Sequence, residues 1–167
     1  DPMATGLLPV LLGLATKSIQ YFLNGDKGYE GEMTLGVKTD TGDADGKVIM
    51  TNYELRITNE GIIRIFKKYT GEIEQVPPMF SAVKINGKRL YELARKGIEV
   101  ERQPRKVTIF ELRLTEDDSH IATPGRFSFY VKCSKGAYVR QLAVDIGDDL
   151  GCGAHLSKLR RVYAHPF

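Results

Sequence analysis

Three separate stretches of this chain alternate apolar and polar residues, and the pattern limits the folds that the chain can adopt. Residues 27–37 place apolar side chains such as Met33 at every second position. Residues 105–114 and 126–134 repeat the pattern, the latter with Phe129 near its centre. A period of two is typical of a strand with one buried face. Because the stretches lie far apart in the chain, they predict a sheet assembled from distant segments.

Helical spacing separates these strands. The clearest helix covers residues 137–151, where Val139, Leu142 and Ile146 belong to one apolar stripe. A second helix over residues 58–69 begins at Thr58 or Asn59, both of which are suitable N-caps. Strands and helices in this order predict an α+β domain, with a mixed, mainly antiparallel sheet flanked by helices.

Shorter signals complete the expected structure. Residues 9–25 predict a strand that runs into a helix. Asn86-Gly87 is a favoured hairpin turn, and a short helix that ends at Gly97 follows it. Residues 155–167 predict a turn followed by a strand.

The composition is that of one globular domain. The chain has 167 residues, of which 42% are hydrophobic and 27% charged. No apolar run approaches the roughly 18 residues that a membrane span requires, so we expect no membrane partner. Cys133 and Cys152 are too few for a disulfide framework, which favours a cytoplasmic location.

Positive charge is concentrated in one segment. Residues 84–106 hold eight Lys or Arg against three Glu, a net charge of +5, whereas the whole chain carries +3. Such a block is either the binding surface for a polyanion or the solvated face of a surface helix. Charge alone favours the second interpretation.

The chain contains only incomplete versions of known metal-binding and nucleotide-binding motifs. The stretch TGDADG resembles a calcium loop, but Thr41 and Asn52 stand where carboxylate ligands are required. Cys133, Cys152 and His155 lack the paired spacing of a zinc site. No glycine-rich nucleotide fingerprint is present. We therefore expect neither a metal nor another cofactor.

Four stretches of the chain carry a family resemblance when they are read together. In chain order they are DPMATG, DKGYEG, QVPPMFSAVKINGKRLYELARKGIEVER and CSKGAYVRQLAVDIGDDLGCGAHLSKLRR. They closely resemble the TruB family, the tRNA pseudouridine synthases that act on uridine 55 of the T arm. The resemblance extends over essentially the whole chain.

The resemblance implies a role for five residues. Asp1 matches the essential catalytic aspartate, which acts either as nucleophile at C1′ of the ribose or as base at C2′. Tyr29 matches the tyrosine that stacks on the flipped uracil, and Arg140 matches the arginine that pairs with the aspartate. Tyr138 and Leu159 match residues that line the uracil pocket. Spacing alone would instead place Tyr29 and Leu159 in a core and Arg140 on an exposed helix face.

The resemblance also explains the basic segment. Residues 77–106 match a thumb-like insertion that grips the T stem-loop of tRNA, and the chain is expected to act as a monomer without a small-molecule cofactor. The expected phosphate contacts are Lys84, Lys88 and Arg89, with Arg95, Arg102, Arg105 and Lys106 as further candidates.

Family members carry additional sequence on both sides of these motifs. We therefore expect residues 1–167 to form a catalytic domain that is incomplete at its N-terminus and lacks a PUA-like domain. Two alternatives stay open: a truncated domain that binds tRNA without turnover, and an oligomeric fragment with an exposed sheet edge.

Overall fold

The computed structural model describes residues 2–51, 57–115 and 125–167. The strands are β1 (Thr5–Gly6), β2 (Lys27–Leu35), β3 (Val37–Thr39), β4 (Val48–Thr51), β5 (Gly71–Gln75), β6 (Lys84–Ile85), β7 (Lys88–Arg89), β8 (Arg105–Leu114), β9 (Arg126–Cys133) and β10 (Ala154–Ala164). The helices are a 3-10 helix η1 (Gly13–Ser18), followed by α1 (Ile19–Leu23), α2 (Asn59–Lys68), α3 (Leu90–Ala94) and α4 (Val139–Asp149).

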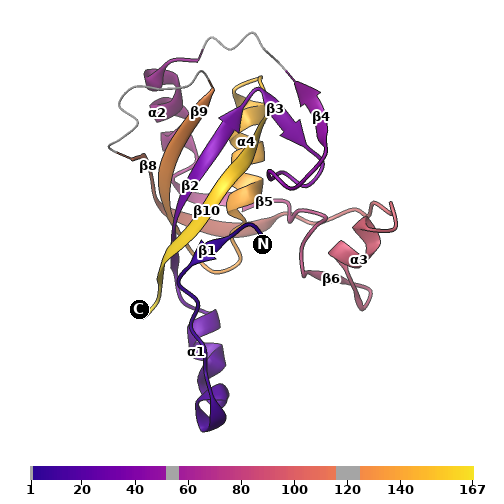
Figure 1. Ribbon diagram of the computed structural model, residues 1–167, viewed down its shortest axis with the longest axis vertical. Helices are drawn as coiled ribbons and strands as arrows, with labels where there is room; N and C mark the ends of the chain where they lie inside the picture. Colours follow the sequence, from indigo (N-terminus) through magenta and orange to yellow (C-terminus); the bar gives the residue numbers. More distant parts are fainter. Residues whose placement is uncertain (1, 52–56, 116–124) are drawn as a thin grey trace.

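Six of these strands form one sheet, in the order β1-β10-β2-β9-β8-β5 (Figure 1). Strand β1 is parallel to β10, and the other four neighbouring pairs are antiparallel. The predicted α+β class with a mixed, mainly antiparallel sheet is therefore confirmed.

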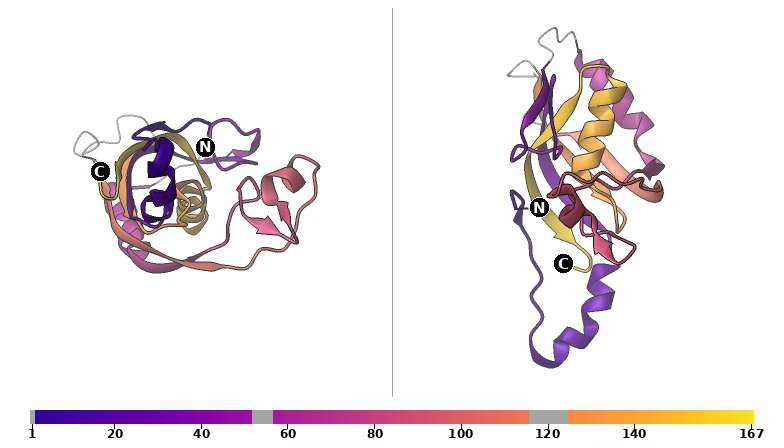
Figure 2. Two further views of the ribbon diagram at one scale, coloured as in Figure 1. Left: turned by 90° about the horizontal axis from the view of Figure 1, so that it is seen from below. Right: turned by 90° about the vertical axis from the view of Figure 1, so that its right-hand side faces the viewer.

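The two longest helices cover one face of the sheet (Figure 2). Helix α4 packs on β10, and α2 packs against β8 and α4. Thr58 is the N-cap of α2, where its side chain accepts a hydrogen bond from the Gly61 N–H. The core between the layers is made of buried side chains from the sheet and both helices, namely Met33, Ile62, Phe66, Phe127, Phe129, Val131, Leu142 and Ile146. Fully burying each such side chain contributes about 1.5–3 kcal/mol.

The opposite face of the sheet is polar, as the alternation requires. Glu32 on β2 forms an ion pair with Lys158 on β10 at 3.0 Å, and Glu30 lies opposite Arg160 in the strand register. Side chains that alternate with these, such as Leu159, are buried on the helix-covered face.

Two local predictions were wrong. Residues 9–12 form no strand, and a 3-10 helix follows them instead, because a short apolar run does not by itself distinguish a strand from other structures. The expected turn after residue 155 is also absent, since β10 already begins at Ala154. A register shift between Leu156 and Lys158 interrupts the alternation there, so the strand was not visible in the pattern.

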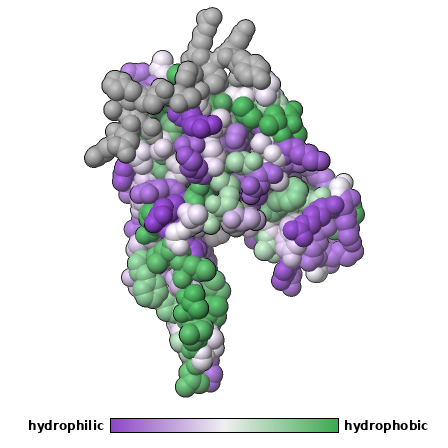
Figure 3. Space-filling view, viewed as in Figure 1, coloured by the Kyte–Doolittle hydropathy of each residue, from purple (hydrophilic) through white to green (hydrophobic). Residues whose placement is uncertain are grey.

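Residues 7–23 form an arm that projects beyond the sheet and is largely apolar (Figure 3). Leu12 and Leu14 are 78% and 82% exposed. The arm touches the other end of the chain, where Phe22 stacks on Phe167 with ring centroids 5.5 Å apart. None of the helices in the described ranges is long and apolar enough to cross a lipid bilayer.

A second projection, the basic lobe, comprises residues 76–104 between β5 and β8 and contains β6, β7 and α3 (Figures 1 and 2). The predicted hairpin turn is confirmed, because Asn86 and Gly87 adopt φ values of 50° and 79° between β6 and β7. Leu90 is fully buried and anchors the lobe. Gly97 follows α3 with a φ of 68°, a conformation that favours glycine.

We expect Leu142→Ala to lower the free energy of unfolding by about 2–5 kcal/mol, because it opens a cavity between α4 and the sheet. Leu14→Ala deletes the same atoms from the exposed arm and should change the value by less than about 0.5 kcal/mol. Urea denaturation of both variants measures the difference. Equal losses would contradict the assignment of the core.

Candidate active site

The motif DPMATG leads directly into β1. Asp1 lies outside the described residues, so its predicted role stays a prediction. Thr5 and Gly6 pair with β10, and the Thr5 hydroxyl donates to the Leu159 carbonyl at 3.4 Å. Gly6 has a φ of 95°, and a Cβ there would lie 2.2 Å from the Arg161 carbonyl oxygen. The glycine of this motif is therefore needed for β1 to lie against β10.

Arg140 is a buried arginine in the first turn of α4. Its side chain is 8% exposed and forms an ion pair with Asp43 at 3.2 Å. One Nη atom donates to the Thr41 carbonyl at 3.2 Å, and the other donates to the Phe80 carbonyl at 3.0 Å. The guanidinium thus joins α4 to two loops, and its interpretation as an exposed helix residue is wrong.

Asp43 is the residue that sequence reasoning missed. It lies in the TGDADG loop and is 3% exposed. Its Oδ1 atom accepts hydrogen bonds from the Thr41 hydroxyl at 2.6 Å and from the Asp45 N–H at 3.1 Å. The loop that resembles a calcium site therefore presents its carboxylate to Arg140. The only sequence signal was a run of turn-forming Asp and Gly residues, which does not indicate a partner.

The electrostatics of Arg140 follow from this burial. Desolvation lowers the pKa of the guanidinium, and the Asp43 carboxylate opposes that shift. Because an arginine has an ordinary pKa above about 12, the group keeps its charge. The Arg140 guanidinium is thus a permanent positive charge at the start of α4. The helix dipole is also positive at this end, so both favour a bound anion there.

Tyr29 lies near the middle of the sheet on β2, opposite Arg161 of β10 and Val131 of β9. It packs partly buried against the core. Burial raises the pKa of its hydroxyl, Cys133 adds to that rise, and the positive charge of Arg161 opposes it. The ring packs against the core on the helix-covered face of the sheet.

Tyr138 is the N-cap residue of α4, and its backbone is fixed by a buried glutamine. The Tyr138 N–H donates to Oε1 of Gln75 at 3.0 Å, and Nε2 of Gln75 donates to the Tyr138 carbonyl at 3.3 Å. These two reciprocal hydrogen bonds join α4 to the end of β5 and fix the backbone position of Tyr138. Sequence reasoning did not identify Gln75.

The predicted site residues border the same core. Ala4, of the first motif, and Tyr29 both pack against the main hydrophobic cluster. That cluster includes Leu159 and also Val139, which lies between Tyr138 and Arg140 in the sequence. The structure therefore brings the motifs that carry Tyr29, Arg140 and Leu159 to one packed unit.

The three predicted phosphate contacts lie on the basic lobe. Lys84, Lys88 and Arg89 are all exposed on its hairpin. The Arg89 guanidinium donates to the Tyr91 hydroxyl at 2.8 Å and lies 5.8 Å from the centroid of that ring. A lobe with exposed cations is well placed to contact a polyanion.

Two of the further candidates already have protein partners. Lys106 forms an ion pair with Glu72 at 2.9 Å. Arg102 pairs with Glu99 at 3.3 Å and donates to the Pro77 carbonyl at 3.2 Å. These residues stabilise the base of the lobe, so they are weaker candidates for phosphate contact than the hairpin residues.

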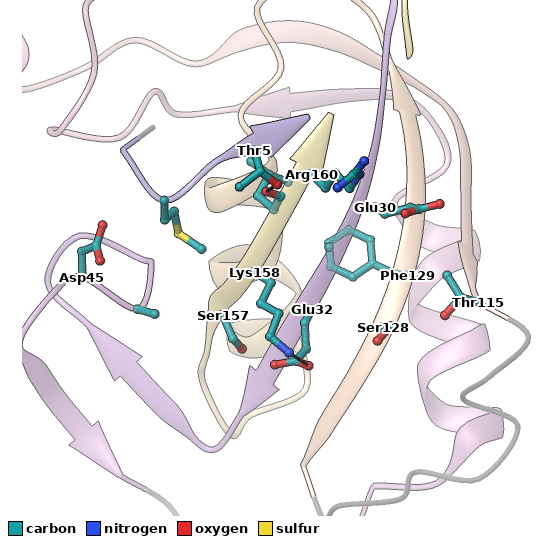
Figure 4. Close-up of a pocket in the computed structure, with 14 residues that line it drawn as sticks. Thr5, Glu30, Glu32, Asp45, Thr115, Ser128, Phe129, Ser157, Lys158 and Arg160 are labelled. Carbon is teal, nitrogen blue, oxygen red and sulfur yellow. Dashed lines mark hydrogen bonds and ion pairs between the residues drawn. The ribbon is translucent and has the colours of Figure 1, made fainter. Parts of the chain in front are cut away.

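A cavity of about 650 Å³ opens on the polar face of the sheet (Figure 4). Its lining includes the charged side chains of Glu32 and Lys158, together with Thr5 at one edge. Among the predicted site residues that the structure describes, only Leu159 contributes to the lining. Met3 and Thr5 of the DPMATG motif also line the cavity, whereas Tyr29, Tyr138 and Arg140 do not.

The described residues contain no group of three or more His, Cys, Asp or Glu that could hold a metal ion. Cys133 is buried on β9, and burial raises the pKa of its thiol to about 12. It is thus a packing residue in the thiol form at neutral pH.

Residues 1–139 match the model of the TruB family pseudouridylate synthase N-terminal domain, and residues 140–167 match the model of the tRNA pseudouridylate synthase B C-terminal domain. The chain belongs to the TruB family. The boundary between the two matches does not divide this structure, because β10 lies within the sheet that the earlier strands form.

The curated TruB relatives are longer than this chain. The chain is 54% identical to the tRNA pseudouridine synthase B of Aromatoleum aromaticum and 50% identical to that of Geobacillus thermodenitrificans. Each alignment covers 100% of this chain but only 52% and 56% of the relative. The chain thus spans about half the length of the relatives it matches.

Solved structures support the same assignment. A chain in a Cbf5–Nop10–Gar1 complex is 30% identical, with a TM-score of 0.72 over 100% of this chain and 39% of that one. A chain in an H/ACA RNP bound to a substrate RNA is 26% identical, with a TM-score of 0.66 over 100% of this chain and 37% of that one. The TruB sheet and its helices are therefore found within much longer chains.

We expect Asp43→Asn to lower the free energy of unfolding by about 3 kcal/mol, because it takes a charged partner from the buried Arg140. Asp45→Asn is the matched control in the same loop, since Asp45 is exposed, and it should cost less than about 0.5 kcal/mol. Thermal denaturation of both variants checks this. A loss for Asp45→Asn as large as that for Asp43→Asn would contradict the role of the ion pair.

Proposed function

We propose that this chain is the catalytic portion of a tRNA pseudouridine synthase that converts uridine 55 of the T arm to pseudouridine. Family membership and the names of the relatives support the reaction. The match of Tyr29, Tyr138, Arg140 and Leu159 to the family motifs supports the site.

The reaction is an isomerisation. The N1–C1′ bond of uridine breaks, the uracil rotates, and a C5–C1′ bond forms, after which the hydrogen at C5 leaves as a proton and N1 gains one. Carboxylates suit glycosidic bond cleavage because they stabilise positive charge that develops on the sugar. Asp1 would supply this carboxylate, as nucleophile at C1′ or as base at C2′.

The observation that carries the proposal is the buried cation at the start of α4. Arg140 is fixed by Asp43 and by two loop carbonyls before any substrate binds. An arginine in this state pairs with a carboxylate through parallel hydrogen bonds and keeps it ionised. A preorganised Arg140 would orient Asp1 in this way, which is the pairing that the family resemblance implies.

The target uridine must leave the base stack before it can react, at a cost of a few kcal/mol. We propose that the ring of Tyr29 repays part of this cost by stacking on the base, while Tyr138 and Leu159 enclose its edges. The packed position of Tyr29 and the fixed backbone of Tyr138 suit this task, because a rigid pocket loses little entropy on binding.

The basic lobe would hold the RNA. One solved structural neighbour is bound to a substrate RNA, and we infer that the exposed cations of Lys84, Lys88 and Arg89 contact phosphates of the T stem-loop. We further propose that the protein acts as a monomer in the cytoplasm, where its two thiols, Cys133 and Cys152, stay reduced.

Tritium release from a T-arm RNA labelled at C5 of uridine tests the chemistry directly. We expect release with the chain itself and none with Asp1→Asn, whereas both proteins should bind the RNA with the same Kd. Release by Asp1→Asn would overturn the assignment of the catalytic aspartate.

The alternative of an RNA-binding module makes a different prediction in the same assay. The exposed cations of the basic lobe favour binding irrespective of turnover. Salt-sensitive binding without tritium release by the chain would support this alternative and refute the proposal of an active enzyme for residues 1–167.

We expect Lys88→Ala combined with Arg89→Ala to weaken RNA binding and to reduce the slope of log Kd against log salt by roughly 1–2, since each phosphate contact contributes about 0.7–0.9. Fluorescence anisotropy at several salt concentrations measures both quantities. Arg64→Ala combined with Lys67→Ala is the matched control, because it removes the same charge from the exposed face of α2. An equal change in slope for both pairs would show that the lobe has no special role.

A further inference from the structure

The two ends of the basic lobe meet at one pair of residues in the sheet. Gln75 is the last residue of β5, Arg105 is the first residue of β8, and the strand register pairs them directly. Inside the lobe, Arg102 donates to the Pro77 carbonyl at 3.2 Å, which ties the outgoing and returning chains together. The lobe therefore leaves the sheet from a single braced root.

Gln75 is a buried polar residue at this root, and both polar atoms of its amide bind one backbone. The residue is 2% exposed. Its Oε1 atom accepts from the Tyr138 N–H at 3.0 Å, and its Nε2 atom donates to the Tyr138 carbonyl at 3.3 Å. Burying an amide without such partners costs free energy, so an apolar side chain would suffice if packing were the only requirement. The hydrogen bonds to Tyr138 therefore explain why the residue is a glutamine.

These hydrogen bonds fall at the N-terminal end of α4. The first N–H groups of a helix have no partner inside it, and within the described part of the chain the Tyr138 side chain makes no capping hydrogen bond. Gln75 instead supplies an acceptor from β5. The residue at the root of the lobe thus fixes the point at which α4 begins.

A second contact joins the lobe to the same turn of α4. Arg140 donates through one Nη atom to the carbonyl of Phe80, which belongs to the lobe, at 3.0 Å. The carbonyl of the next residue, Ser81, accepts from the Tyr91 N–H of α3 at 3.1 Å. Residues 75–81 therefore connect the start of α4 with the body of the lobe.

We infer that Gln75 is a positioning residue that fixes the start of α4 to the root of the basic lobe, so that RNA held by the lobe presents its uridine to Tyr138 and Arg140 in one arrangement. This inference rests on the proposed function, because it takes the lobe as the RNA-binding element and α4 as part of the site. Gln75 itself touches neither the uridine nor the phosphates in this role.

Gln75→Met tests the contact, because methionine fills a similar volume and removes both hydrogen bonds. The measurement is hydrogen exchange at the Tyr138 N–H, followed by NMR. Ala137-Tyr138 is the only Ala-Tyr pair in the sequence, so labelling alanine carbonyls with 13C and tyrosine amides with 15N identifies this one signal. We expect exchange to become at least about tenfold faster in Gln75→Met, because the N–H loses its acceptor.

Gln141→Met is the matched control. Gln141 lies on α4, and its amide donates to Asp145 on the same helix at 2.7 Å. This variant removes the same amide group but leaves the contact between α4 and the lobe intact. Exchange at the Tyr138 N–H should stay as in the parent chain.

Kinetics of tritium release supply the second measurement. Misplacing a group of the site by about 1 Å can cost about 100-fold in rate, so we expect kcat of Gln75→Met to fall by about 10- to 100-fold. The Kd for T-arm RNA should stay within about threefold, because the exposed cations of the hairpin are unchanged. If Gln75→Met fails to fold, Gln75→Asn replaces it. Its amide ends one methylene short of Tyr138, and the same changes are expected.

The outcomes separate this inference from the proposed function. Unchanged exchange at Tyr138, or an unchanged kcat, in the folded Gln75 variant would overturn the positioning role. An equal loss of kcat in Gln141→Met would also overturn it, since the loss would then follow any weakening of α4. If the parent chain releases no tritium but exchange still accelerates in Gln75→Met, the fixation of α4 is supported and the proposed activity of the chain fails instead.

Discussion

The pairing of β10 with β1 and β2 is the constraint on which this structure depends. Strand β10 comes last in the chain, yet it lies between two strands from the first 35 residues. Its helix-covered face carries the buried Leu159, and α4 packs directly on it. The sheet is therefore incomplete until residues 154–164 pair with β1 and β2. This pairing brings the N-terminal motif, Tyr29 and α4 into one unit. Contacts between such distant segments also favour slow folding, because loop closure precedes the stabilising contacts.

Positive charge has two distinct physical uses in the molecule. Arg140 is tied to two backbone carbonyls and to Asp43, so its geometry is fixed before any ligand arrives. Lys84 and Lys88 are exposed on a hairpin, where cations gain little from any one protein partner. The fixed cation suits orientation of a reacting group, whereas the exposed ones suit adaptable contact with a flexible polyanion.

The parts of the fold that sequence predicted are those with a strong local period. Strands β2, β8 and β9 and helix α4 were all visible, since each has one buried face. Strand β10 was only partly visible because a bulge interrupts its alternation. The predicted site residues came from family resemblance, because Tyr29 and Leu159 look like ordinary core residues. Asp43 and Gln75 were missed because their importance comes from partners distant in sequence, which no local pattern reveals.

The apolar arm and the basic lobe are two projections that respond to different properties of the solvent. Anions such as sulfate are excluded from protein surfaces and therefore strengthen apolar burial. They favour contacts that cover the exposed leucines of residues 7–23. The cations of the lobe respond instead to ionic strength, which screens their field over about 10 Å at 0.1 M. The choice of salt, and not only its concentration, therefore affects the exposed leucines of the arm and the cations of the lobe in different ways.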